Sequence, residues 1–158
     1  MRTKPEILLV DDNGADVKLA LHALEVHVER EKIAVARDGQ EALDLVLSDG
    51  KENSVAIGTL KLILLDLKLP KVDGFEVLRE LKGRDKTRYI PIVILSSSNQ
   101  ERDLRDSYDL GANSYLQKPV DFDHYQKLVE ALAEYWLTAN SAYRPVPVES
   151  TSAAIPEV

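Results

Sequence analysis

Five polar side chains in this sequence stand at or just after the end of a short apolar run. They are Asp11, Asp12, Asp66, Ser96 and Lys118. Short apolar runs without alternation are typical of strands that are buried on both faces of a sheet. The carboxyl ends of parallel strands meet at one edge, so we expect these five side chains to converge there.

The chemistry of such a group follows from its charges. Three neighbouring carboxylates repel one another, so the pKa of at least one should be raised unless a cation lies among them. Oxygen ligands without histidine or cysteine favour a hard cation, and we predict Mg²⁺. Asp66, held at a strand end, is placed to attack a phosphorus atom. The acyl phosphate formed carries a charge of roughly −1.5 to −2, which Lys118 and the Ser96 hydroxyl are placed to bind.

Each residue alone has an ordinary explanation. Asp11 or Asp12 could cap the helix that follows, and Asp66 could begin a turn before Pro70. Ser96 could be a loop hydroxyl, and Lys118 a solvated surface lysine. The coincidence of all of them at strand ends favours a functional site.

The apolar spacing predicts five strand–helix pairs in strict alternation. Strands are expected at 7–10, 33–36, 60–65, 91–95 and within 111–116, and helices at 14–28, 39–47, 74–82, 100–110 and 121–137. Alternation of this kind predicts an α/β fold, a five-stranded parallel sheet with helices on both faces. Residues 49–59 are expected to form a polar loop. Residues 138–158, rich in alanine, serine, threonine and proline, are expected to form a flexible tail after a single domain at 1–137.

Composition excludes several other classes of function. The chain has 158 residues, of which 44% are hydrophobic and 30% charged, with a net charge of −7 and no cysteine. This acidity argues against nucleic acid or an anionic membrane surface as a partner. The lack of cysteine excludes disulfides and thiolate chemistry. No segment is long enough to span a bilayer, so we expect a cytoplasmic protein.

Four stretches resemble the receiver domain of two-component response regulators: ILLVDDN, LILLDLKLPKVDGFEVL, IPIVILSSS and GANSYLQKP. The resemblance covers about residues 5–137 and implies a flavodoxin-like (βα)5 fold. It implies that Asp66 is the phosphoacceptor and that Asp11 and Asp12 hold Mg²⁺, with Asp12 the direct ligand. It makes the backbone carbonyl of Lys68 a further metal ligand. Such a protein accepts a phosphoryl group and releases it again, and signals rather than acting as an enzyme on other substrates.

The same resemblance assigns the switch. Ser96 is its hydroxyl, Lys118 the phosphate partner, and the Lys118–Pro119 bond is expected to be cis. Tyr115 matches the aromatic switch position, although a half-buried strand tyrosine is an equal alternative. Lys68 stands where the family commonly has Asn or Met, which leaves the lifetime of the phosphorylated state open.

The partner implied by the family is a histidine kinase. The long loop at 49–59 and the ending EALAEYWLTAN are similar to single-domain regulators of phytochrome kinases, and we expect no output domain after residue 137. The first helix carries a second stripe, Ala15, Leu19, His22 and Val26, roughly opposite its core stripe. We predict that Ala15 and Leu19 contact the kinase. Scattered surface side chains are the alternative.

A homodimer is predicted through the face formed by 100–110, the fifth strand and 121–137. Arg102 and Arg105 alternate there with acidic residues, so a two-fold axis could pair the charges reciprocally. Tyr135, Trp136 and Leu137 are large apolar side chains that would need cover. A solvated charged face is the alternative.

Four other functions compete with signal output. The same chemistry would serve a phosphorelay intermediate or a phosphate sink. A metal-dependent aspartyl phosphatase needs a D-x-D pattern that neither Asp11-Asp12-Asn13 nor Asp66-Leu67-Lys68 provides. A module that only binds a ligand would leave the acidic site unexplained, and no Gly-rich phosphate loop follows the first strand.

Overall fold

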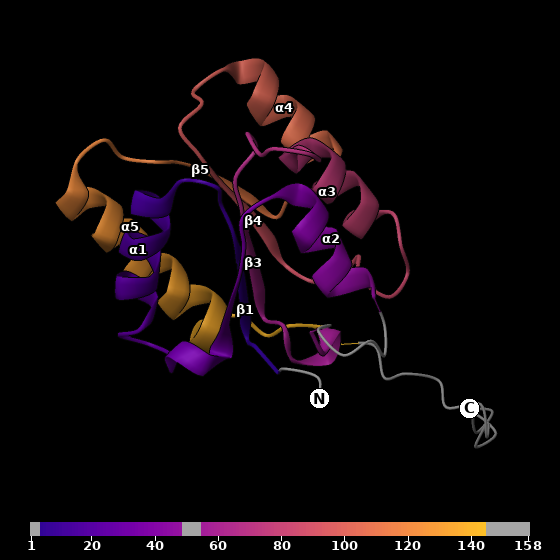
Figure 1. The fold of residues 1–158 in the computed structure, drawn as a ribbon, viewed down its shortest axis with the longest axis horizontal. Coiled ribbons are helices and arrows are strands. Elements are labelled where there is room, and N and C mark those ends of the chain that lie inside the picture. Colours follow the sequence, from indigo (N-terminus) through magenta and orange to yellow (C-terminus); the bar gives the residue numbers. More distant parts are fainter. Residues whose placement is uncertain (1–3, 49–54, 145–158) are drawn as a thin grey trace.

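A five-stranded parallel sheet forms the centre of the computed structural model, which describes residues 4–48 and 55–144 (Figure 1). Its strands are β1 (Ile7–Val10), β2 (Ile33–Ala36), β3 (Leu62–Leu65), β4 (Ile92–Ser96) and β5 (Ser114–Gln117). They lie in the order β2-β1-β3-β4-β5, and every neighbouring pair is parallel. The predicted fold is confirmed. Residues 49–54 of the expected loop and 145–158 of the expected tail lie outside the described residues.

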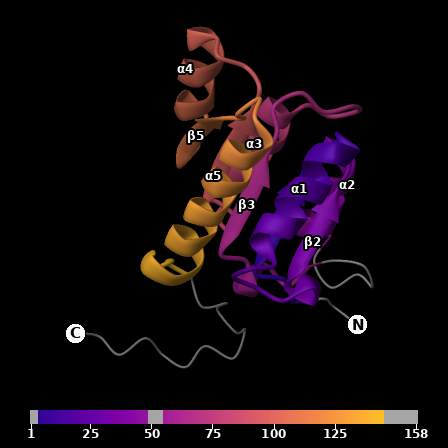
Figure 2. The same ribbon diagram turned by 90° about the vertical axis from the view of Figure 1, so that its left-hand side faces the viewer.

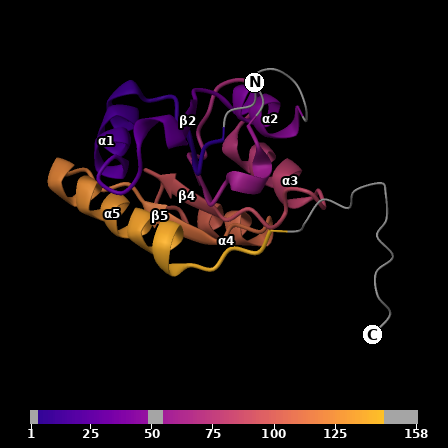
Figure 3. The same cartoon turned by 90° about the horizontal axis from the view of Figure 1, so that it is seen from below.

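Helices cover both faces of this sheet. They are α1 (Gly14–Leu24), α2 (Gly39–Leu47), α3 (Gly74–Lys82), α4 (Glu101–Asp109) and α5 (Phe122–Glu134). Helices α1 and α5 lie side by side on one face (Figure 2), and α2 and α3 pack together on the other (Figure 3). Helix α4 contacts β5 and α3, and Ser107 is its one buried residue. None of the helices within 4–48 and 55–144 is long and apolar enough to cross a membrane.

Alternate residues of the strands point to opposite faces of the sheet and pack into two separate hydrophobic cores. Leu8, Ile63 and Ile94 pack with α2 and α3. Leu9 and Leu64 point the other way and pack with α1 and α5. Because both faces are covered, β1 and β3 read as continuous apolar runs rather than as alternating ones.

Side-chain caps fix where the helices begin. Asn13, at the N-cap of α1, accepts a hydrogen bond from the Asp16 amide, and Asp38 and Asp73 play the same part for α2 and α3. The alternative in which Asp11 or Asp12 caps α1 is therefore wrong. Since Asn13 satisfies the helix end, both aspartates are left for other contacts.

Three details differ from expectation. Helix α1 ends at Leu24 rather than at 28, because the amides of His27 and Val28 both turn back to the Leu24 carbonyl. Helix α5 gives way after Glu134 to a π-helical turn, Tyr135–Ala139. The Lys118–Pro119 bond is trans, as no cis peptide occurs in the described residues; trans is the intrinsically favoured form even before proline.

The chain after the π-helical turn returns toward the opposite side of the sheet (Figure 3). The ring of Tyr143 meets that of Tyr89 edge to face, with 4.6 Å between centroids. Tyr89 belongs to the loop between α3 and β4 and also lies under the Arg88 guanidinium. The last described residues are therefore held against that loop.

A half-buried lysine links the starts of the last two strands. Lys82, at the end of α3, donates hydrogen bonds to the carbonyls of Arg88 and Ile90 and to the Asn113 side chain. The same Asn113 oxygen accepts the Ile92 amide at the start of β4. These contacts fix the alignment of β4 with β5, and with it the relative positions of Ser96 and Lys118 at their far ends.

Candidate acidic site

The acidic site is built where β1 and β3 end side by side. Val10 and Leu65 are paired in register, so Asp11 and Asp66 follow at the same level of the sheet. The Asp66 amide donates to the Val10 carbonyl, which holds the two strand ends together past the last pair. Both carboxylates are buried, whereas Asp12 is exposed.

Lys118 crosses this site from the end of β5. Its ammonium lies 2.8 Å from Asp11 Oδ2 and 2.9 Å from Asp66 Oδ2. It also lies 3.0 Å from Asp16 Oδ2, and only 8% of its side chain is exposed. An ammonium has three N–H donors, so the three carboxylates use all of them. The expected convergence of Asp11, Asp66 and Lys118 is present.

The charges shift the pKa values of this group in definite directions. Burial raises the pKa of the Asp11 carboxyl, although hydrogen bonds from Lys118 and the Asn13 amide oppose that shift. The negative charge of Asp66 adds to the rise only as a minor cause. Burial alone would lower the pKa of Lys118, but its bonds to Asp11 and Asp66 outweigh burial and raise that pKa. The lysine therefore stays charged, and removal from water matters more to Asp11 than the repulsion between carboxylates.

A divalent cation fits beside this lysine. Asp11, Asp12 and Asp66 offer oxygens that lie within 4.8 Å of one another, and they form the one such cluster in residues 4–48 and 55–144. All of the donors are carboxylate oxygens, the chemistry that Mg²⁺ or Mn²⁺ prefers. Asp66 Oδ1 is the less engaged of its two oxygens, since it receives only a long contact of 3.4 Å from the Lys68 amide. The Lys68 residue is exposed.

Ser96 and Tyr115 meet through the loop between β4 and α4. The fully buried Ser96 hydroxyl accepts the Ser98 amide at 3.2 Å, and Tyr115 donates to the Ser98 carbonyl at 3.0 Å. Ser98 also donates to the Asp103 carboxylate on α4. Tyr115 is half-buried on β5, as the strand-tyrosine alternative expects; its role as the aromatic switch stays a prediction.

The predicted docking stripe lies on the outer side of α1, next to the acidic site. Ala15, His22 and Val26 are exposed, and Leu19 is half-buried against the core between α1 and α5. The stripe begins two residues after the Asn13 cap. Contact between this stripe and a kinase stays a prediction.

Sequence reasoning missed Asp16. An acidic residue in the first turn of a helix is explained by the helix dipole and the capping pattern, and Asp16 shows both features. Its side chain nevertheless reaches Lys118, which is 102 positions away. The only hint in the sequence was its place five residues after Asp11.

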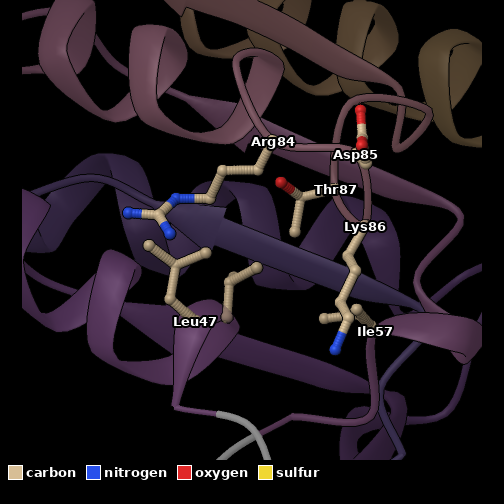
Figure 4. A pocket seen from close by; sticks show the side chains of 7 residues that line it. Leu47, Ile57, Arg84, Asp85, Lys86 and Thr87 are labelled. Carbon is tan, nitrogen blue, oxygen red and sulfur yellow. The ribbon is translucent and has the colours of Figure 1, made fainter.

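A separate cavity of about 340 Å³ lies between the end of α2 and the loop after α3 (Figure 4). Val46, Leu47 and Ile57 form its apolar wall, and residues 84–87 line the rest. None of these residues takes part in the acidic cluster. The cavity adds nothing to the site at the strand ends.

Known proteins share both the sequence and the fold. Residues 7–130 match the family described as "Response regulator receiver domain". The chain is 43% identical to the "Probable methanogenesis regulatory protein FilR2" of Methanothrix harundinacea over 140 residues, 88% of each chain. It is 39% identical to "Response regulator Rcp1" of Synechocystis over 132 residues, 83% of this chain and 88% of Rcp1.

Two crystal structures are similar over most of the chain. The phosphorylated cyanobacterial phytochrome response regulator RcpA superposes with a TM-score of 0.81 at 37% identity, covering 88% of this chain and 98% of RcpA. The Mn(2+)-bound form of Rcp1 gives a TM-score of 0.79 at 35% identity, covering 88% and 99%.

Proposed function

Because the chain belongs to the response regulator receiver domain family, we propose that Asp66 accepts a phosphoryl group from the phosphohistidine of a histidine kinase. The observation that supports this most directly is the position of the Asp66 carboxylate. It lies at the end of β3, 2.9 Å from a charged lysine and within 4.8 Å of two further carboxylates. On this proposal the protein carries a signal by being phosphorylated itself. We also propose that it acts in the cytoplasm.

In the transfer, a carboxylate oxygen of Asp66 forms a bond to phosphorus as the bond between phosphorus and the histidine nitrogen breaks. Oδ1 is the better candidate for the attacking oxygen, because Lys118 engages Oδ2. Lys118 turns to an oxygen of the new phosphoryl group and neutralises part of its charge. Asp11, Asp12, Asp66 and the Lys68 carbonyl are the residues that we propose to hold Mg²⁺. The bound ion supplies positive charge that shields the carboxylates and the transferring group.

The switch that we propose uses the loop between β4 and α4. The Ser96 hydroxyl, which accepts the Ser98 amide, turns to donate to the phosphoryl group. Tyr115 on β5 donates to the Ser98 carbonyl, and Ser98 donates to Asp103 on α4. A movement of this loop would therefore displace side chains on both elements. We propose that the face formed by α4, β5 and α5 changes as a result.

The partner is a histidine kinase, and a phytochrome kinase is the narrower proposal. Similarity to the phytochrome response regulator RcpA supports a phytochrome, whereas the similarity to FilR2, a probable methanogenesis regulatory protein, favours a kinase of another pathway. Whether the protein is a signal output, a relay intermediate or a phosphate sink depends on that partner. We also propose a homodimer through the α4-β5-α5 face.

The test is incubation with acetyl phosphate and Mg²⁺, followed by intact mass. The natural chain should gain one phosphoryl group, and Asp66→Asn should gain none, since the amide oxygen is not a nucleophile of comparable strength. Asp85→Asn is the matched control, because that carboxylate is fully exposed on the loop after α3, and it should behave as the natural chain. EDTA should abolish the gain. An unmodified natural chain under these conditions would falsify the proposal.

A further inference from the structure

One of the three carboxylates that contact Lys118 lies outside the metal cluster. Asp11, Asp12 and Asp66 form the group that fits a cation, yet the lysine also contacts Asp16 at 3.0 Å. Asp16 comes from the first turn of α1 rather than from a strand end. It therefore approaches the ammonium without belonging to the cation cluster.

The position of Asp16 is fixed independently of the lysine. Its amide donates to Asn13 Oδ1 at 3.0 Å, which is the N-cap bond of α1. Its backbone carbonyl faces the hydroxyl of Tyr125 on α5, at 3.4 Å, and that tyrosine is only 2% exposed. The side chain of Asp16 is 27% exposed, so a carboxylate is held partly in water at the edge of a buried site.

A divalent cation in the cluster and the ammonium would share two carboxylates, those of Asp11 and Asp66. Lys118 uses one oxygen each of Asp11 and Asp66, and both residues belong to the cation cluster. Two cations this close repel one another, most strongly in a site with little water. Asp16 is the carboxylate on the lysine that stands outside this cluster, so a metal bound there leaves its contact with the lysine untouched.

We propose that Asp16 is a positioning residue that keeps the Lys118 ammonium beside Asp66 while a divalent cation occupies the cluster. This inference rests on the proposed function, because the lysine held in this way is the one that meets the incoming phosphoryl group. It goes beyond that function, since it assigns a task to a carboxylate outside the metal cluster. An acidic residue that served only the helix dipole would not affect the lysine.

The deciding experiment follows the side-chain ammonium signal of Lys118 by ¹⁵N NMR in the full chain, without and with saturating Mg²⁺. In the natural chain the signal should persist in both conditions, because an ammonium in hydrogen bonds exchanges its protons slowly. In Asp16→Asn, which keeps the backbone cap, the signal should persist without metal and be lost with Mg²⁺. Asp16→Glu should restore it. Asp123→Asn, which removes a first-turn carboxylate from α5, is the control for a dipole effect and should leave the signal intact.

Persistence of the Lys118 signal in Mg²⁺-loaded Asp16→Asn would overturn the inference. If the Lys118 signal is lost in that variant, its phosphorylation by acetyl phosphate at saturating Mg²⁺ should be about tenfold slower than in the natural chain. This is the scale of one charge-assisted hydrogen bond at a partly exposed site. If the natural chain is not phosphorylated at all, the proposed function fails, while the NMR comparison still decides the role of Asp16.

Discussion

At the scale of single residues, Gly74 decides how the backbone after Asp66 is packed. A Cβ at this position would lie 2.2 Å from the Asp66 carbonyl oxygen and 2.6 Å from the Leu67 Cα. The Gly74 amide in turn donates to the Leu67 carbonyl at 2.8 Å. The start of α3 thus presses directly on the strand end that carries the carboxylate, and only a residue without a side chain fits there.

We predict that Gly74→Ala moves Asp66 without unfolding the protein. The overpacked contact should cost about 1–3 kcal/mol of unfolding free energy. A displacement near 1 Å should slow phosphorylation by acetyl phosphate by roughly 10²-fold. Urea unfolding and the phosphorylation rate measure the two effects. Gly58→Ala, where nothing lies within 4 Å of the added Cβ, is the control and should change neither; equal rates for the two variants would contradict the prediction.

The contrast between Asp66 and Asp16 shows how far the sequence alone reaches. Asp66 was predictable because an acidic residue that ends an apolar run has few structural explanations. Asp16 was not, because capping and the helix dipole already explain an acid at that place. Its contact with Lys118 depends on how closely α1 packs beside the end of β5, and no spacing within one helix encodes that distance.

At the scale of elements, one side of α1 packs into the hydrophobic core and the other side faces solvent. Val17, Ala20 and Leu24 are buried against the sheet and α5. The same apolar spacing predicted helix as far as 28, and Val28 does pack against this core. The chain reaches it through a turn instead, so the pattern predicted the contact correctly and the conformation wrongly.

We predict that Leu19→Asp on the outer side of α1 slows phosphotransfer from the cognate kinase by on the order of tenfold or more, as expected for a central interface residue. Phosphorylation by acetyl phosphate should be unchanged, which shows that the variant is folded. Tyr89→Asp is the control, since that tyrosine is 39% exposed on the loop between α3 and β4, away from α1 and from the proposed dimer face. The docking proposal fails if kinase transfer to Leu19→Asp proceeds at the natural rate.

At the scale of the whole molecule, most of the exposed large apolar side chains in the described residues belong to α4, to α5 or to the segments beside α5. Leu104, Tyr108, Val120, Phe122 and Tyr135 are all exposed. The three residues expected to need cover behave differently, because Trp136 and Leu137 pack against the core and only Tyr135 is exposed. Asp103 is also engaged by Ser98. The dimer proposal therefore depends on Leu104, Tyr108 and Phe122 more than on the end of α5.

We predict a dimeric mass by analytical ultracentrifugation at micromolar concentration, in at least one of the unphosphorylated and phosphorylated states. Tyr108→Arg should shift that mass toward the monomer, because it places a charge where an apolar ring would be buried. Tyr89→Arg, on the loop between α3 and β4, is the control outside this face. A monomeric mass in both states of the natural chain would refute the dimer.

The bond from Lys118 to Asp11 joins positions 107 apart in the chain. A polypeptide still emerging from the ribosome thus displays its acidic side chains long before the lysine that neutralises them has been made. Until β5 has been made and has paired with β4, Asp11 and Asp66 stand without the ammonium that they share in the folded chain.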